Sequence, residues 1–197
     1  MKLGVTGGIG AGKTSVCRIF NILGIPVFSA DSEARIIMET DAGVTSKINS
    51  IAGKDLFVNG LLDRKELAKL IFNSKRLLEQ VNKVVHPVVF EKFLIWADRQ
   101  DAPYLILEAA IIFESNASKL VDKIITVIAP VEERIERVIQ RNDLTREQVM
   151  ERMRNQMEDA ERLGQSDYVI DNSENEMIIP SVLKIHEDIL YHIKTGK

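Results

Sequence analysis

The chain has 197 residues, of which 45% are hydrophobic and 28% are charged, so it can bury the core of one folded domain. Its longest apolar runs are far shorter than the roughly 18 to 20 residues that cross a bilayer, which excludes a spanning helix. The net charge of −3 argues against a generic nucleic-acid binder, and the single cysteine excludes an internal disulfide. The first residues carry no signal-peptide pattern. We therefore expect a cytoplasmic protein with neither nucleic-acid nor membrane partners.

The first elements of the chain alternate between strand and helix. Lys2 to Thr6 is predicted to form a buried strand, and apolar residues at helical spacing predict a helix from Lys13 to Leu23 that ends at Gly24. A second strand is expected over Ile25 to Phe28, ending near Asp31. This order is typical of a parallel sheet.

The middle of the chain shows a different pattern. From Ser32 to Arg99 the pattern is helical, interrupted at Gly43, at Asn59-Gly60 and at Pro87, and it contains no convincing strand. We interpret this segment as a helical insertion.

Strand patterns return in the second half of the chain. Strands are expected over Tyr104 to Glu108, Lys123 to Ala129 and Tyr168 to Ile170. A last helix is expected from about Glu174 to Ile193. The alternation predicts a three-layer α/β fold with a parallel sheet. We expect one domain over residues 1–197. It would comprise a core (1–31, 101–130 and 165–197), a helical insertion (32–100) and a further helical segment (131–164).

A glycine-rich segment lies between the first strand and the first helix. Residues 7–14 match G-x-x-x-x-G-K-[ST], the P-loop, in the strand-to-helix context that this motif requires. Glycines let the backbone wrap around a triphosphate, with N–H groups and a helix N-terminus facing the anion. The residues assigned to ATP here are Gly8, Gly10, Ala11, Gly12, Lys13, Thr14 and Ser15. Lys13 is expected to contact the β- and γ-phosphates during catalysis, and the Thr14 hydroxyl to bind Mg²⁺.

Other interpretations of the loop are weaker. A tight turn without a ligand would have the same glycines, but rarely in this context. A dinucleotide-binding turn requires a third glycine where Lys13 stands.

Three carboxylates stand at or after predicted strand ends, where open parallel sheets bind ligands. Asp31 would orient the acceptor hydroxyl and take its proton, but it would equally suit the N-cap of the next helix. Glu108 could hold a water on Mg²⁺, and Glu114 is expected in the following helix. For both glutamates we favour a solvated surface position over these roles.

Arginines dominate one later stretch of the chain. Between Arg134 and Arg162 there are seven arginines and no lysine, although the chain has 14 lysines and 12 arginines. Guanidinium binds phosphate through two parallel hydrogen bonds, so several of these residues could close over ATP. The stretch also contains enough acidic residues to pair them all on a solvated helix, which is our interpretation for most. Arg141 is the favoured catalytic residue, followed by Arg137 and Arg162.

Taken in order, these motifs resemble the dephospho-coenzyme A kinase family from Leu3 to about Leu190. The matching segments are Thr6 to Thr14, Ala30-Asp31 with Ala34-Arg35, Leu62-Asp63-Arg64 with Leu67 and Phe72, His86-Pro87, Glu114, Arg137 to Arg141, and Arg162 followed by Asp171-Asn172. The resemblance implies phosphorylation by ATP of the ribose 3′-hydroxyl of dephospho-coenzyme A. It implies nucleotide contacts for Arg137 and Asn172, and substrate contacts for Asp31, Arg35, Arg64, His86, Glu114 and Arg162.

Two positions depart from the family pattern. Ser29 stands where an additional aspartate is common, which concentrates the base role on Asp31, and Ala110 stands where proline is common. His86 would also suit a packed histidine. Another small-molecule P-loop kinase, such as a nucleoside monophosphate kinase, remains the alternative function, and a structural nucleotide-binding module is a further one. A nucleotide-dependent switch is disfavoured because no Asn-Lys-x-Asp motif is present.

Overall fold

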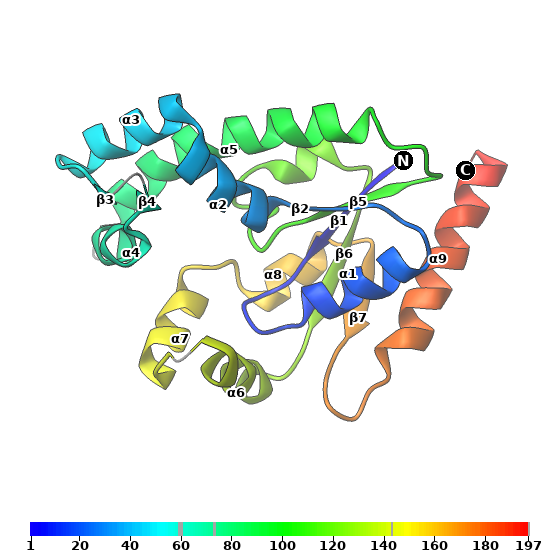
Figure 1. Ribbon diagram of the computed structural model, residues 1–197. Coiled ribbons are helices and arrows are strands. Elements are labelled where there is room, and N and C mark those ends of the chain that lie inside the picture. Colours follow the sequence, from blue (N-terminus) through cyan, green and yellow to red (C-terminus); the bar gives the residue numbers. More distant parts are fainter. Residues whose placement is uncertain (59–60, 73, 143, 197) are drawn as a thin grey trace. The chain divides into compact units, whose positions relative to one another are not determined.

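The computed structural model describes residues 1–58, 61–72, 74–142 and 144–196 (Figure 1). It divides into two compact units, unit 1 with Met1–Ser29 and Arg99–Lys197, and unit 2 with Ala30–Asp98. Within the described ranges, no helix is long and apolar enough to cross a membrane.

Unit 1 is built on a five-stranded sheet in which every neighbouring pair is parallel. The strands, in spatial order, are β2 (Val27–Ser29), β5 (Leu105–Glu108), β1 (Lys2–Thr6), β6 (Lys123–Ile128) and β7 (Tyr168–Asp171). The predicted α/β class with a parallel sheet is therefore confirmed, and the predicted strands lie within two residues of the observed ones at each end.

β1 lies at the centre of this sheet, where Leu3 is in register with Ile106 of β5 and Lys123 of β6. Residues 3–6 of β1 are all buried, as expected for a parallel strand that is covered on both faces. Because all five strands run the same way, the residues that follow β1, β5 and β7 emerge at one edge of the sheet. This edge carries the P-loop.

One face of the sheet packs against α1 (Lys13–Ile22) and α9 (Ile178–Thr195). Side chains alternate along a strand, so Leu3 and Val5 of β1 and Ile125 and Val127 of β6 point into this core. The helices supply buried residues at helical spacing, namely Val16, Cys17, Phe20, Val182, Ile185 and Ile189.

The alternate residues of β1 and β6 point to the other face of the sheet. There they contact the segment that follows β5 and the segment between residue 164 and β7. Thr6 Oγ1 donates to the Ala110 carbonyl at 3.4 Å, and the Thr126 and Ser166 hydroxyls are 2.5 Å apart. The helix predicted at Glu114 is wrong, because residues 110–116 form turns that lead into the 3-10 helix η1 (Ala117–Leu120). Asn116 has a positive φ of 62°, which a right-handed helix does not accommodate.

Residues 131–164 form three helices in unit 1: α6 (Val131–Asn142), α7 (Arg146–Arg154) and α8 (Asp159–Gly164). α6 and α7 share a small apolar cluster of Ile135, Val138 and Val149, against which Ile9 of the P-loop packs. Thr145 and Gln148 form a capping box that starts α7.

Unit 2 is mainly helical. Its elements are α2 (Ala30–Thr40), α3 (Ala42–Ala52), β3 (Phe57–Val58), β4 (Leu61–Leu62), α4 (Arg64–Phe72) and α5 (Lys75–Ala97). α5 buries a stripe at four-residue spacing, comprising Val81, Val85, Val89, Phe93 and Ala97. α2, α3 and α4 pack against α5, so this stripe organises the unit.

Three predictions for unit 2 are wrong. Pro87 does not interrupt a helix, because α5 continues through it and Val85 and Val89 on either side are buried; this packing offsets a local cost of about 3 kcal/mol. The break assigned to Gly43 lies at Asp41, whose carboxylate caps α3 by accepting from Val44 N at 2.9 Å.

The strands β3 and β4 are not predicted from the sequence, because strands of two residues are too short to show alternation. The predicted Asn59-Gly60 turn lies outside the described residues.

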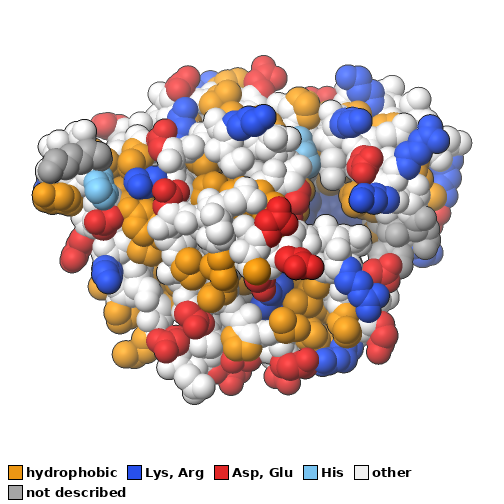
Figure 2. All heavy atoms as spheres, turned by 180° about the vertical axis from the view of Figure 1, so that it is seen from behind, with side chains coloured by type: hydrophobic (Ala, Val, Ile, Leu, Met, Phe, Trp, Pro, Cys, Tyr) orange, Lys and Arg blue, Asp and Glu red, His pale blue; other side chains and the backbone are white. Residues whose placement is uncertain are grey.

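On the face drawn in Figure 2, acidic and basic side chains are interspersed with each other and with hydrophobic ones. The charge on this face is therefore mixed.

The core position of Cys17 yields a prediction about its reactivity. Cys17 is 4% exposed, and burial, followed by the nearby Glu108 carboxylate, raises the pKa of its thiol well above the usual range. The thiolate is the reactive form, so we expect Cys17 in the native protein to react with a disulfide reagent at pH 8 at least about 100-fold more slowly than in urea-unfolded protein. Because Cys17 is the single cysteine, the absorbance of the released thiol reports on it alone. Similar rates in both states would contradict this packing.

Candidate functional site

The P-loop, residues 7–14, adopts the backbone conformation for which its glycines are suited. Gly7, Gly10 and Gly12 have φ values of 151°, 79° and 96°, in a region that side chains disfavour. Ala11 N donates to the Gly8 carbonyl at 3.1 Å and closes a tight turn. Gly12 precedes the first residue of α1, so the loop leads into a helix N-terminus, where an anion is favoured.

Lys13 and Thr14 lie at the start of α1. Lys13 Nζ donates to the carbonyl oxygens of Gly7 at 2.9 Å and Gly8 at 3.4 Å, so its ammonium group folds back over the loop. Thr14 Oγ1 donates to Glu108 Oε1 at 2.9 Å, and Ser15 follows as an exposed residue. Glu108 is 8% exposed, so the predicted solvated surface position is wrong for this residue.

Neighbouring segments approach the P-loop glycines closely. A Cβ on Gly8 would lie 2.0 Å from Arg134 Nη2, and one on Gly10 would lie 2.4 Å from the Arg134 carbonyl oxygen. A Cβ on Gly12 would lie 1.9 Å from Asn172 Nδ2, which donates to the Ala11 carbonyl at 2.8 Å. The glycines are therefore required by the protein that surrounds the loop, even before a ligand is considered.

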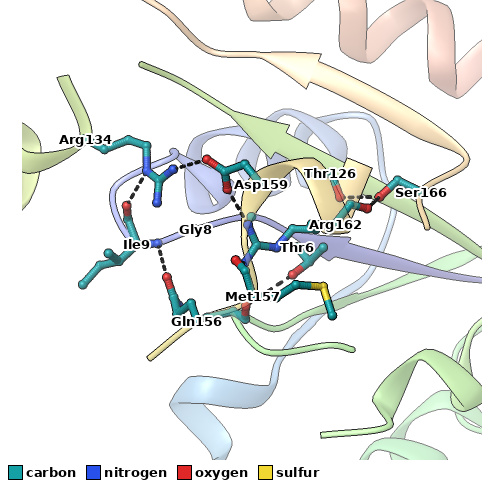
Figure 3. Close-up of polar contacts among 12 residues, drawn as sticks. Thr6, Gly8, Ile9, Thr126, Arg134, Gln156, Met157, Asp159, Arg162 and Ser166 are labelled. Carbon is teal, nitrogen blue, oxygen red and sulfur yellow. Dashed lines mark hydrogen bonds and ion pairs between the residues drawn. The ribbon is translucent and has the colours of Figure 1, made fainter. Parts of the chain in front are cut away.

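Figure 3 shows the polar contacts behind the loop. Ile9 N donates to Gln156 Oε1 at 2.8 Å, and the Ile9 carbonyl accepts from Arg134 Nε at 2.9 Å. Asp159 accepts from Arg134 Nη1 and from Arg162 Nη1, both at 2.6 Å. The Arg134 side chain is 4% exposed and that of Arg162 is fully buried.

The same contacts continue toward Glu114. Arg162 Nη2 donates to the Met157 carbonyl at 2.8 Å, and Met157 N donates to Glu114 Oε1 at 2.9 Å. Arg162 Nε is buried and makes no hydrogen bond among the described residues. Glu114 is exposed, but its carboxylate is held by this backbone contact.

The arginines of α6 differ in their surroundings. Arg137 Nη2 pairs with Glu133 at 2.9 Å, while its Nη1 is buried without a hydrogen bond among the described residues. Arg141 lies exposed in the last turn of α6. Arg134, Arg137, Arg146 and Arg162 each have a carboxylate partner, as the pairing interpretation predicts. The predicted solvated position is wrong for Arg134 and Arg162, which are buried.

Unit 2 holds the remaining candidates. Asp31 and Arg35 are exposed on α2; Asp31 lies in the first turn after Ala30, so the N-cap interpretation is wrong. Arg64 pairs with Glu39 at 2.7 Å. His86 is half-buried and stacks on Phe90; burial lowers its pKa, while the Asp31 carboxylate opposes that shift. Asp31 and His86 therefore interact electrostatically within this unit.

Comparison with known proteins identifies the family. A family model for dephospho-CoA kinase, CoaE, matches residues 1–177. The chain belongs to the dephospho-CoA kinase family. The dephospho-CoA kinase of Bacteroides fragilis is 36% identical over 94% of this chain and 91% of its own length. The dephospho-CoA kinase of Porphyromonas gingivalis is 37% identical over 96% of this chain and 94% of its own length.

Solved structures share the fold of this chain. TT1252 from Thermus thermophilus superposes with a TM-score of 0.82 at 30% identity, covering 98% of this chain and 97% of its own. Dephospho-CoA kinase from Campylobacter jejuni superposes with a TM-score of 0.67 at 27% identity, covering 96% of this chain and 98% of its own. Shikimate kinase from Acinetobacter baumannii shares the fold. It superposes with a TM-score of 0.55 at 19% identity, covering 97% of this chain and 93% of its own. The predicted P-loop kinase fold is thus confirmed.

Sequence patterns alone missed part of the site of this family member. The patterns place Arg134 among the seven arginines of one stretch, and they single out neither Gln156 nor Asp159, although all three contact the P-loop or each other. The spacing of α6 shows which residues share a face, but it cannot show that this face meets the P-loop about 125 positions earlier in the chain.

The crowding around Gly10 predicts an effect of substitution. Gly10→Ala would combine a disfavoured φ with a clash against the Arg134 backbone, so we expect the KM for ATP to rise about tenfold or more. Gly24→Ala is the matched control, because Gly24 has a φ of 82° but nothing within 4 Å of the added Cβ. It should cost roughly 1 kcal/mol in urea unfolding and leave that KM unchanged. Equal KM values for both variants would contradict the clash.

Proposed function

We propose that this chain transfers the terminal phosphoryl group of ATP to the ribose 3′-hydroxyl of dephospho-coenzyme A, giving coenzyme A and ADP. The observation that carries the proposal is a complete P-loop in a chain that matches the dephospho-CoA kinase family over residues 1–177. The alternative of a nucleoside monophosphate kinase is not favoured, because the named relatives cover nearly the whole chain as dephospho-CoA kinases.

The donor side is assigned to unit 1. The loop backbone from Gly8 to Ser15 would hold the phosphates of ATP, with Lys13 at the β- and γ-phosphates and Arg137 and Asn172 as further nucleotide contacts. Asn172 is suited to this role because it already braces the Ala11 carbonyl of the loop. The exposed Arg141 would stabilise the charge of the transferring group from residues 131–164, the proposed lid.

The residues around Thr14 fit Mg²⁺. A hydroxyl and a nearly buried carboxylate, 2.9 Å apart, are the hard oxygen donors that this ion prefers. Thr14 Oγ1 would be a direct ligand, because its proton is donated to Glu108, and Glu108 would act through water. When bound, Mg²⁺ neutralises charge on the β- and γ-phosphates. Among the described residues, no group of three His, Cys, Asp or Glu side chains lies together that could hold a metal ion.

The acceptor side is assigned to Asp31, Arg35, Arg64, His86, Glu114 and Arg162. In the transfer, the bond between the γ-phosphorus and the β–γ bridging oxygen breaks and a bond to the 3′-oxygen forms, while Asp31 takes the hydroxyl proton. The exposure of Asp31 leaves its carboxylate accessible to a substrate. Residues 32–100 would then be the substrate-binding insertion, and residues 1–31, 101–130 and 165–197 the nucleotide-binding core. A cytoplasmic location suits an enzyme that draws on ATP.

The proposal is tested by ADP release in the presence of Mg²⁺ with dephospho-coenzyme A, AMP, CMP or shikimate as acceptor. We expect release well above background with dephospho-coenzyme A alone, and a product phosphorylated at the 3′-position by mass spectrometry and phosphorus NMR. Lys13→Ala serves as the blank, because it removes the ammonium group of the loop. A clear preference for another acceptor would replace the proposed substrate.

The assignment of Asp31 predicts a specific kinetic defect. Asp31→Asn should lower kcat by roughly 10² or more, because the amide cannot accept the proton, while the Kd for ATP stays within twofold. Glu33→Gln is the matched control, since Glu33 is the other carboxylate in the first turn of α2. If Asp31 only stabilises the helix N-terminus, both variants will show near-normal kcat, although Glu33→Gln also loses the ion pair with Lys92 at 2.8 Å.

A further inference from the structure

Two arginines are buried behind the P-loop and share one carboxylate. The Arg134 side chain is 4% exposed, that of Arg162 is 0% exposed, and each donates to a different oxygen of Asp159 at 2.6 Å. Figure 3 shows Asp159 between the two guanidinium groups. We call this set the Arg134–Asp159–Arg162 network.

The Arg134 end of the network contacts the P-loop at several points. Arg134 Nε donates to the Ile9 carbonyl at 2.9 Å, and Arg134 Nη2 lies where a Cβ of Gly8 would be. Ile9 is also held through its N–H by Gln156 and through its side chain by the cluster of α6 and α7. Both polar groups of Ile9 are therefore engaged by the protein, which sets the direction of the neighbouring peptide groups that face a phosphate.

The carboxylate is essential to this arrangement on chemical grounds. Guanidinium only donates hydrogen bonds, so two neighbouring buried guanidinium groups repel each other unless an acceptor carrying negative charge lies between them. Asp159 offers one oxygen to each. Its own side chain is 36% exposed, so changing it leaves no cavity in the core.

We infer that Asp159 is a positioning residue, which holds Arg134 against Gly8 and Ile9 and so keeps the P-loop in its nucleotide-binding conformation. The inference rests on the proposed function only in requiring that the loop binds ATP. A loop already in its bound conformation binds with less loss of entropy, so the network contributes to nucleotide affinity although Asp159 is not assigned any contact with ATP. The contacts from Arg162 to Met157 and on to Glu114 anchor the far end.

Asp159→Asn tests this role, because the amide keeps the shape but presents N–H groups to one of the two arginines. We expect the Kd for ADP, measured by calorimetry, and the KM for ATP to rise about tenfold, while kcat at saturating ATP falls less than about threefold. Glu161→Gln removes the same charge from the same short helix, at an exposed position, and should leave all three values unchanged. An ADP affinity of folded Asp159→Asn within twofold of the parent would overturn the inference.

Arg134→Lys provides the second variant and decides the question if Asp159→Asn does not fold. It keeps the positive charge, but a single ammonium group cannot reproduce the guanidinium fork that joins Ile9 to Asp159. The same rise in the Kd for ADP supports the positioning role, and an unchanged Kd refutes it. ADP binding needs no acceptor, so these results stand apart from the proposed function, which fails only if dephospho-coenzyme A is not phosphorylated.

Discussion

Unit 1 depends on the close approach of α6 to the P-loop. The backbone and guanidinium group of Arg134 occupy the space that side chains at residues 8 and 10 would need, and the Asn172 amide does the same at residue 12. Such contact is possible only for glycine, whose lack of a Cβ lets backbone and side chains from distant segments meet. The loop is therefore shaped from outside by α6 and by the residue after β7.

Several polar groups of the loop are already engaged by the protein. The N–H groups of Ile9 and Ala11 donate to Gln156 and Gly8, while the Lys13 ammonium group lies over the loop and Thr14 points to Glu108. Under the proposed function, the Thr14 hydroxyl and the Glu108 carboxylate would serve the metal ion, and the Lys13 ammonium group would serve the phosphates. The parallel sheet makes this possible, because β1 and β5 are neighbours and end at the same edge.

Local patterns predicted much of the fold. The strands of unit 1 and the helix after the P-loop follow from apolar runs and helical spacing, and the structure has them within about two residues. The errors have physical causes. α5 continues through Pro87 because its buried stripe is long, and α3 begins after Asp41 because that carboxylate supplies the cap. Neither packing nor capping geometry is visible in residue spacing.

The sequence by itself determined the P-loop, the parallel α/β class and the family, because each rests on a local motif or on the order of motifs along the chain. The structure alone revealed why Gly8 and Gly10 are glycines, that Glu108 is buried against Thr14, and that Arg134 contacts the loop. These features join residues about 94 to 125 positions apart, and such contacts are decided by how the sheet and its helices pack. The glycine loop is thus recognised from its sequence, while the contacts that surround it are a property of the tertiary structure.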